Sequence, residues 1–388
     1  MRVLMLVATS VVTDTRVMRE ARTLASAGHQ VHIIGRSVPD GFEPGGGVTV
    51  SSVGTSSVFR AEGGSSLSGR ELSLPVRAAR WALLPQHRRS SFRRWADGAL
   101  QDGRHRDMDV VHAHDFTALE AGATLAREKN ASLVYDSHEL WSGMPREYRP
   151  TPLADRADVA KEKALGGQAD AVITVGDGVA RALRDLHGWD NISVVRNTFP
   201  SRGTLPELPE RPLGLVYAGR VAAFRELEVI ATASTGIDLP IEICGPADDT
   251  WLTGFDPGSA TVVPAMPLEE ASDHLAGAGL ALVTHSNRWA NHRLAMPNKL
   301  FHAVSLGVPV VATDVGELGR IVREFDLGTL YEPGNPGALI QAVGQAVARY
   351  ERLRFAVMAA REELSWTTDS ARLLDVYAKL TVDRKDRS

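Results

Sequence analysis

The stretch from His285 to Glu317, HSNRWANHRLAMPNKLFHAVSLGVPVVATDVGE, contains the strongest local signals for the fold. It is typical of a loop, a short helix that begins beside Pro297, a stop at Gly307 and a buried strand. Proline suits the first turn of a helix, and glycine readily adopts the left-handed backbone that ends one. The apolar run from Val308 to Ala312 predicts a strand covered on both faces of a parallel sheet.

The start of this helix has the form of an anion site. The first turn of a helix presents unpaired N–H groups and the positive end of the helix dipole, and Lys299 adds a full charge there. In open α/β sheets, ligands bind where helices begin beside the carboxyl ends of strands. The sequence therefore predicts an anion site around Asn298 and Lys299.

The composition fits a large soluble α/β protein. With 388 residues, 44% of them hydrophobic, the chain is better divided into two domains than folded around one core. A formal net charge of −4 argues against a dedicated nucleic-acid binder. The single Cys244 allows no intramolecular disulfide and is typical of a reducing cytoplasm. The apolar run from Val3 to Ala8 is too short for a signal-peptide core, and we expect no membrane-spanning helix.

Short apolar runs alternate with helical stretches along the chain, which is the pattern of βα units. The expected strands of the first half are 3–7, 31–34, 109–114, 133–136, 171–175 and 192–195, with a further candidate at 48–53 inside a Gly- and Ser-rich surface loop. Those of the second half are 215–218, 241–244, 261–263, 280–283 and 308–312.

A proline-rich segment separates the two series of strands. Prolines stand at positions 200, 206, 209 and 212, where the βα pattern is interrupted. We expect an N-terminal Rossmann-like domain over 1–199, a linker over 200–212, a C-terminal Rossmann-like domain over 213–362, and a C-terminal helix over 363–388 that packs back toward the first domain. Two doubly wound domains would place the carboxyl ends of both sheets around a cleft.

A series of short motifs runs through the chain. They are Asp14-Thr-Arg-Val-Met-Arg-Glu-Ala, Gly28-His-Gln-Val, Asp109-Val-Val-His-Ala-His-Asp, Val134-Tyr-Asp-Ser-His-Glu, Tyr217-Ala-Gly-Arg, Ile243-Cys-Gly-Pro and Pro297-Asn-Lys-Leu-Phe. In order and spacing they resemble the group-1 family of GT-B glycosyltransferases. The resemblance implies a retaining enzyme that takes a sugar from a nucleotide diphosphate sugar, with the donor in the C-terminal domain and the acceptor in the N-terminal domain.

The resemblance also implies which residues bind the donor. Departure of the diphosphate builds negative charge, so preorganised cations stabilise the transition state. Arg220 and Arg225 occupy positions where the family has an Arg and a Lys that contact the diphosphate, and a guanidinium can bind phosphate oxygens in a bidentate fork. Two solvated arginines in a loop are the alternative. The expected donor-binding residues are Gly219, Arg220, Arg225, Gly245, Asn298, Lys299 and His302.

Three histidines lie at the ends of neighbouring strands in the first domain. His112 and His114 point to one face of their strand, and His138 follows the next strand, so a zinc site is one interpretation. The resemblance instead implies that His114 lies beside the transferred sugar, where it joins Arg220 and Arg225 in catalysis, and that His112 is a buried strand histidine. The expected acceptor-side residues are Asp14, Arg16, His138 and Glu139. Helix caps or surface ion pairs are the alternative for them.

We expect no metal and no cofactor. The run from Asp107 to Asp109 offers the Asp-x-Asp of a metal-dependent GT-A enzyme, but polar residues commonly precede a strand, and we interpret these aspartates as structural. In the GT-B arrangement, cations and a helix dipole take the place of the metal, and the leaving phosphate itself can accept the proton of the acceptor.

One position departs from the family. His302 stands where the family usually has a glutamate that binds the ribose hydroxyls, and Leu294 stands where its partner would be. One imidazole nitrogen accepts one hydrogen bond, whereas a carboxylate accepts from both hydroxyls of a diol. Two other functions therefore stay open: a non-catalytic sugar-nucleotide-binding partner of another transferase, and a sugar-nucleotide epimerase on the same fold.

The segment from Arg77 to Trp95 combines arginines with aromatic and aliphatic side chains and has no acidic residue. This composition is typical of a peripheral contact with an anionic membrane surface, which would place a cytoplasmic enzyme on the inner face of a membrane beside a lipid-linked acceptor. An ordinary helix pair with core aromatics and solvated arginines is the alternative. The sequence names neither the sugar nor the acceptor, which could be an envelope polysaccharide, a glycolipid or a small glycoside.

Overall fold

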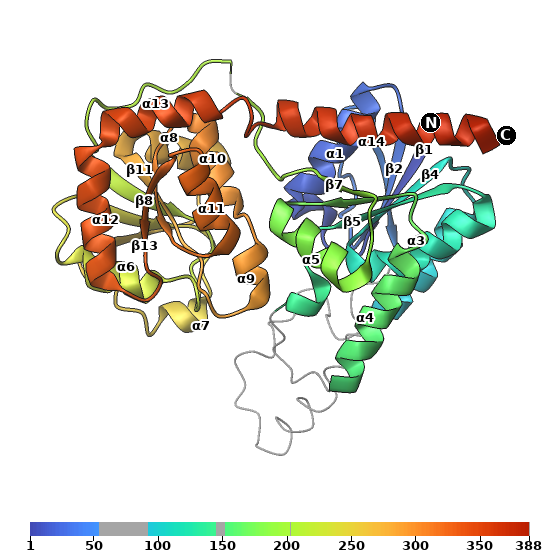
Figure 1. The fold of residues 1–388 in the computed structure, drawn as a ribbon, viewed down its shortest axis with the longest axis horizontal. Helices are drawn as coiled ribbons and strands as arrows, with labels where there is room; N and C mark the ends of the chain where they lie inside the picture. The colour runs from blue at the N-terminus through green and yellow to red at the C-terminus, as the bar shows by residue number, and fades with distance from the viewer. Residues whose placement is uncertain (54–91, 145–151, 202, 388) are drawn as a thin grey trace. The chain divides into compact units, whose positions relative to one another are not determined.

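The computed structural model describes residues 1–53, 92–144, 152–201 and 203–387 (Figure 1). Within these residues the chain divides into two compact units. Unit 1 comprises Met1–Thr174, Leu183–Ser193 and Arg372–Ser388, and unit 2 comprises Val175–Ala182 and Val194–Ala371. Two helices, α5 (Asp177–His187) and α14 (Trp366–Arg387), contribute residues to both units.

Unit 1 is built around a seven-stranded sheet in the order β3-β2-β1-β4-β5-β6-β7. Its strands are β1 (Arg2–Val7), β2 (Gln30–Arg36), β3 (Thr49–Val53), β4 (Val110–His114), β5 (Ser132–Ser137), β6 (Ala171–Thr174) and β7 (Ile192–Val194). Its helices include α1 (Thr15–Ser26), α3 (Asp115–Lys129), α4 (Pro152–Gly166) and residues 92–104, with short 3-10 turns at Val11–Thr13 and Trp141–Gly143. Strands β4 and β5 are buried along their whole length, as expected of parallel strands covered on both faces.

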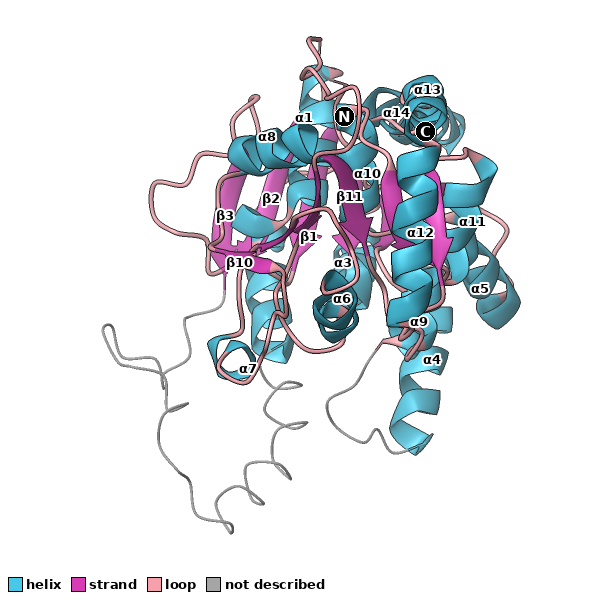
Figure 2. Ribbon diagram, turned by 90° about the vertical axis from the view of Figure 1, so that its left-hand side faces the viewer, coloured by secondary structure: helices cyan, strands magenta, loops and turns pink. Residues whose placement is uncertain are grey.

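Unit 2 contains a six-stranded sheet in the order β10-β9-β8-β11-β12-β13. Its strands are β8 (Gly214–Ala218), β9 (Ile241–Cys244), β10 (Thr261–Val263), β11 (Gly279–Val283), β12 (Val310–Thr313) and β13 (Gly328–Tyr331). Its helices are α6 (Leu227–Ser234), α7 (Asp249–Leu252), α8 (Leu268–Ala278), α9 (Ala290–Leu294), α10 (Asn298–Leu306), α11 (Gly316–Glu324), α12 (Pro336–Ala348) and α13 (Tyr350–Ala360). In both units helices cover the sheet strands (Figure 2).

The strand order reverses once in each sheet. In unit 1 the change falls between β1 and β4, and in unit 2 it falls between β8 and β11. At such a point the loops that follow the two strands diverge, and open α/β sheets bind their ligands there. The site candidates follow these strands: His114 ends β4, and Gly219 directly follows β8.

The predicted helix and strand of the 285–317 stretch are confirmed. Helix α10 begins at Asn298, directly after Pro297, and ends at Gly307, whose φ is 80°. Its apolar side chains enter a core cluster of unit 2, and each large one stabilises the fold by about 1.5–3 kcal/mol. Replacing Gly307 by alanine would force a Cβ into a left-handed backbone and to within 3.1 Å of the Met358 sulfur.

The membrane hypothesis falls mostly on residues 54–91, which lie outside the described residues. At the C-terminal end of the 77–95 segment, Arg93 and Arg94 are exposed, whereas Trp95 is only 1% exposed and belongs to the core. Within the described ranges, none of the helices combines the length and the apolar character that a bilayer span requires.

Candidate active site

A buried ion network lies where β4 and β5 end in unit 1, against helix α1. Arg16 donates from Nε to Asp136 Oδ2 at 3.0 Å and from a terminal nitrogen to Asp136 Oδ1 at 2.7 Å. The same terminal nitrogen lies 3.0 Å from Glu20 Oε1, one helical turn further along α1. All three residues are at most 2% exposed. Arg16 without Asp136, or Asp136 without Arg16, would therefore be a costly buried charge.

His138 adds a second cation to this network. Its Nε2 lies 2.9 Å from Asp136 Oδ2, and its Nδ1 lies 3.4 Å from Asp115 Oδ2. Burial alone would lower the pKa of His138, but the two carboxylates outweigh burial and raise it to about 10. Against the effect of burial, Arg16 and His138 hold the pKa of Asp136 well below its ordinary value. At neutral pH, Asp136 is therefore a carboxylate between two cations.

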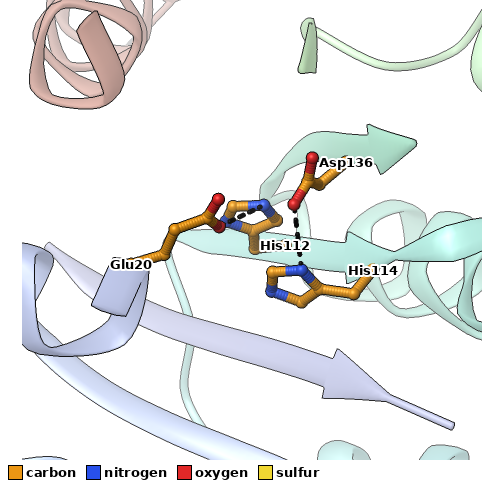
Figure 3. Close-up of side chains that lie close together, drawn as sticks. All are labelled: Glu20, His112, His114 and Asp136. Atoms are coloured by element: carbon orange, nitrogen blue, oxygen red, sulfur yellow. Dashed lines mark hydrogen bonds and ion pairs between the residues drawn. The ribbon is translucent and has the colours of Figure 1, made fainter. Parts of the chain in front are cut away.

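His114 has one ring nitrogen bonded and the other without a partner. Its Nδ1 lies 3.1 Å from Asp136 Oδ2 (Figure 3). Because a carboxylate only accepts hydrogen bonds, this network assigns the proton to Nδ1 and leaves a lone pair on Nε2. Among the described residues Nε2 has no hydrogen-bond partner, although His114 is only 2% exposed. Unsatisfied buried groups are rare, and this one is suited to accept a hydrogen bond from a ligand hydroxyl.

The histidine and carboxylate side chains of this network also have the composition of a metal site. One ligand atom from each of four residues lies within 4.8 Å of the others, and these residues are Glu20, His112, His114 and Asp136 (Figure 3). Both carboxylates of this group already pair with Arg16, and Asp136 also pairs with cationic His138. A divalent ion would add positive charge where two cations already stand, so the charge distribution favours a hydrogen-bonded network.

The residues expected on the acceptor side take varied positions. Asp14 caps α1 by accepting the Val17 N–H at 3.1 Å, and Arg16 forms the buried ion pair. A helix cap is a role that the sequence left open, whereas the Arg16 ion pair is buried and not the surface pair that was considered. The side chain of His138 is 15% exposed, and Glu139 is exposed. Their contact with an acceptor stays a prediction.

In unit 2, positively charged side chains lie close together in the segments that follow β8 and β11. Lys299 places Nζ 4.0 Å from the centroid of the Tyr217 ring, and burial together with Arg225 lowers its pKa to about 7. Burial, Lys299, His292 and Arg225 lower the pKa of His285 to about 3. No carboxylate among the described residues opposes either shift. An anion bound here would relieve this repulsion.

The loop that holds Arg225 has an unusual backbone. Its neighbours Phe224 and Glu226 have φ values of 63° and 62°, a region that side-chain-bearing residues seldom adopt. The Arg225 carbonyl accepts from Thr284 Oγ1 at 2.7 Å, and the Glu226 carboxylate accepts from the Gly334 N–H at 2.6 Å. Such strain persists only where surrounding contacts hold it, and it is typical of ligand sites.

Two glycines let the strand-end loops of unit 2 approach each other. A Cβ on Gly245, whose φ is 143°, would lie 2.0 Å from the Gly219 carbonyl oxygen. A Cβ on Gly219 would lie 3.0 Å from Lys299 Cδ. The glycines therefore shape the backbone beside the cations. Arg220 follows Gly219, is exposed, and has no ion-pair partner among the described residues.

The two remaining donor candidates lie on α10. Asn298 is exposed, and its Oδ1 accepts from Asn197 Nδ2 at 2.9 Å. His302 is only 7% exposed; its Nε2 lies 2.8 Å from Ser272 Oγ, and its ring stacks on Phe199 with centroids 5.0 Å apart. The His302 ring is therefore already held by neighbours, and a role in ribose binding stays a prediction.

Sequence reasoning missed three residues of these sites. Glu20 could have been found, because it lies four residues after Arg16 and so on the same face of α1. His285 follows β11 at the point where the strand order reverses, which is also a readable signal. Tyr377, which contacts His112 from α14, has no local signal in the sequence.

Comparisons with known proteins assign the chain to a family. Residues 13–198 match the model described as a glycosyl transferase 4-like domain, and residues 215–349 match that of glycosyl transferases group 1. The chain belongs to the group-1 glycosyltransferases, which transfer a sugar from a nucleotide sugar. A relative in Xylanimonas cellulosilytica, named D-inositol 3-phosphate glycosyltransferase, is 27% identical over 331 residues, which are 75% of this chain and 77% of the relative.

Solved structures show the same architecture. Sucrose-phosphate synthase from Thermosynechococcus elongatus superposes with a TM-score of 0.73 at 16% identity, covering 98% of this chain and 99% of that one. HepE from Anabaena, solved in complex with UDP, superposes with a TM-score of 0.67 at 13% identity, covering 98% and 100%. The fold is therefore GT-B, with two Rossmann-like units, as the motifs implied.

Proposed function

We propose that this glycosyltransferase retains the anomeric configuration and needs no metal, with the nucleoside diphosphate sugar bound by unit 2 and the acceptor bound by unit 1. The observation that supports donor binding most is that no carboxylate among the described residues opposes the positive charges of Arg225 and Lys299, which lie in the segments after β8 and β11. A diphosphate supplies the negative charge that this group lacks. HepE, a protein of the same fold, was solved in complex with UDP, which supports a nucleotide-sugar donor.

The residues present suit the reaction. The bond between the anomeric carbon and the phosphate oxygen breaks, and Arg220, Arg225 and Lys299 stabilise the charge that builds on the leaving diphosphate. The acceptor hydroxyl forms the new bond on the same face of the sugar, and its proton passes to the departing phosphate oxygen. His114 Nε2 accepts a hydrogen bond from a hydroxyl of the transferred sugar, since its Nδ1 is bound to Asp136.

A panel of nucleotide sugars tests the donor half of this proposal. A bound donor raises the melting temperature because it binds only the native state. The stabilising donor should then be hydrolysed slowly when no acceptor is present, and NMR of the product of transfer should show a retained anomer. Stabilisation with neither hydrolysis nor transfer would leave a non-catalytic binding protein. Conversion of one nucleotide sugar into another without acceptor would indicate an epimerase.

The acceptor is proposed from relatives. Because the Xylanimonas relative is named for D-inositol 3-phosphate, phosphorylated polyols are the first acceptors to test. A Bacillus subtilis relative, 24% identical over 272 residues, is named as a putative teichuronic acid biosynthesis glycosyltransferase, so envelope polysaccharide precursors come next. Transfer to either class would select it, and transfer to neither would leave glycolipids and small glycosides.

We also propose that residues 77–94 contact an anionic membrane surface, with the buried Trp95 left out of that contact. The support is their composition, arginines with aromatic and aliphatic residues and no acid. Sedimentation with anionic liposomes should fall with salt and should weaken when Arg88, Arg89, Arg93 and Arg94 are changed to Ser. Wild-type protein that stays in the supernatant with anionic vesicles at low salt would contradict this proposal.

A further inference from the structure

We propose that Tyr377 and His112 are positioning residues for His114: the Tyr377 hydroxyl holds the His112 ring by a hydrogen bond to Nδ1, and the His112 ring, stacked on His114, sets the plane of that ring. The inference rests on the proposed function, in which His114 contacts the transferred sugar. It concerns residues that have no contact with substrate in that proposal and that act only through His114.

The contacts form a continuous buried chain within unit 1. The Tyr377 hydroxyl on α14 lies 2.8 Å from His112 Nδ1 on β4. The His112 and His114 rings are stacked, with centroids 4.3 Å apart and planes 12° from parallel. Beyond the two rings, His112 Nε2 lies 3.8 Å from Glu20 Oε2 (Figure 3). Tyr377, His112, His114 and Glu20 are each at most 2% exposed, so water does not compete for these contacts.

The surroundings of His112 select one tautomer. Burial, followed by the neighbouring His114, lowers the pKa of His112 well below its ordinary value, so its neutral ring carries one N–H. With the proton on Nδ1, the lone pair of Nε2 would face the Glu20 carboxylate. With the proton on Nε2, an N–H faces that carboxylate, and Nδ1 accepts from the Tyr377 hydroxyl. Burial raises the pKa of Glu20 to about 7. Above that pH Glu20 is a carboxylate, and the second arrangement is favoured because it replaces a repulsive contact with an attractive one.

The tyrosine suits the donor role in this chain. Burial, with the charges of Glu20 and Asp136, raises the pKa of Tyr377 well above its ordinary value, so the hydroxyl keeps its proton. Its hydrogen bond to Nδ1 therefore opposes rotation of the His112 ring. Because His112 is neutral, it adds no charge to the site, and its effect on His114 is geometric.

The His114 ring is then held at one edge by a hydrogen bond and on one face by stacking. The edge is fixed by Nδ1 at 3.1 Å from Asp136 Oδ2, and the face is fixed by the His112 ring. These two constraints define where the unpartnered Nε2 points. A group that must meet a substrate hydroxyl needs this precision, because displacement of a reacting contact by about 1 Å can cost about a hundredfold in rate.

The decisive experiment compares Tyr377→Phe with Tyr135→Phe. Both variants remove one buried hydroxyl from unit 1; that of Tyr135 donates to Glu162 Oε1 at 2.7 Å and is not part of the His112 chain. Both should lower the melting temperature by a similar amount. We expect Tyr377→Phe alone to lower kcat by about ten- to a hundredfold while the donor KM stays within about twofold of wild type. Wild-type kcat in Tyr377→Phe, or equal losses in both variants, would overturn the inference.

A spectroscopic measurement tests the chain without any turnover. In protein labelled with ¹⁵N-histidine and measured at pH 8, where Glu20 is ionised, His112 should show a protonated Nε2. Tyr377→Phe should shift the ring signals of His112 and His114, whereas Tyr135→Phe should leave them in place. A protonated Nδ1 on wild-type His112 would overturn the tautomer assignment. If the wild-type protein transferred no sugar from any donor, the proposed function would fail, and these signals would still decide whether the positioning chain exists.

Discussion

The candidate sites of the two units differ in how their charges are paired. In unit 1, Asp136 lies between Arg16 and His138, and every one of these charges faces an opposite charge. In unit 2, Arg225 and Lys299 face each other's positive charge, and no carboxylate among the described residues opposes them. A paired network keeps its geometry without a ligand, whereas unpaired cations gain most when an anion arrives. Under the proposed function, unit 1 therefore positions the residues that contact the sugar, and unit 2 binds the diphosphate of the donor.

The largest effect should come from breaking the paired network. Asp136→Asn leaves the guanidinium of Arg16 buried and without its main partner, and removal of one partner of a buried pair costs about 3–5 kcal/mol of unfolding free energy. Urea unfolding measures this loss. The matched control is Glu128→Gln, which breaks an exposed bidentate pair with Arg104 and should leave the urea midpoint unchanged. Equal midpoints for both variants would mean that burial does not make the difference.

Removing a cation from unit 2 should weaken ligand binding without lowering the stability of the ligand-free protein, in contrast to Asp136→Asn. Arg225→Ala, and likewise Arg220→Ala, should weaken donor binding and slow transfer by about ten- to a hundredfold, since a charge-assisted phosphate contact contributes about 1.5–3 kcal/mol. The ligand-free Arg225→Ala protein should be no less stable than wild type, because repulsion with Lys299 is relieved. Calorimetric titration and thermal unfolding give both quantities. Arg127→Ala, on the exposed face of α3, is the control for an ordinary lost arginine.

Because no carboxylate among the described residues opposes the lowered pKa of Lys299, we predict that the protein takes up protons when the donor binds. Burial and Arg225 lower its pKa to about 7 in the free protein, and a bound diphosphate favours the charged form and raises that pKa. Between the free and bound pKa values, binding should therefore absorb up to about one proton and should weaken as pH rises above 7.

Calorimetry in Tris and in HEPES measures this uptake, because the two buffers release protons with different heats. Lys299→Arg keeps the charge at every pH and should abolish the uptake while keeping donor binding. Equal heats in both buffers for wild type at pH 8 would mean that the protonation of Lys299 does not change when the donor binds, and would contradict this prediction.

The smallest effect concerns His302. Because Ser272 and Phe199 already hold its ring, we expect His302→Ala to weaken donor affinity by only a fewfold. His302→Glu should retain or improve affinity, since a carboxylate accepts from both hydroxyls of a ribose. Ser272→Ala separates the effect of packing from that of ribose contact. If none of these variants changes the affinity for the donor or the free nucleotide, His302 is a core residue and the ribose is bound elsewhere.

Local signals in the sequence predicted the fold well, and the roles of the donor-side residues stay predictions. The apolar runs marked the strands of both sheets except β13, which the sequence analysis missed, and Pro297 and Gly307 marked the limits of α10. These features depend on neighbours along the chain, which a single sequence displays. The paired network was not predicted as a unit, because Asp136 lies 120 residues after Arg16 and the choice between a surface contact and a buried pair depends on tertiary packing.

The contact between His112 and Tyr377 also constrains the order in which the protein can fold during synthesis. Tyr377 leaves the ribosome 265 residues after His112. At about 5–20 residues per second, the first unit waits on the order of 10–50 s for the residue that completes its buried chain. Leu373, Val376 and Leu380 of the same helix arrive with it as core side chains. A nascent chain stalled before α14 should therefore expose apolar surface on its N-terminal unit and need protection from aggregation until that helix arrives.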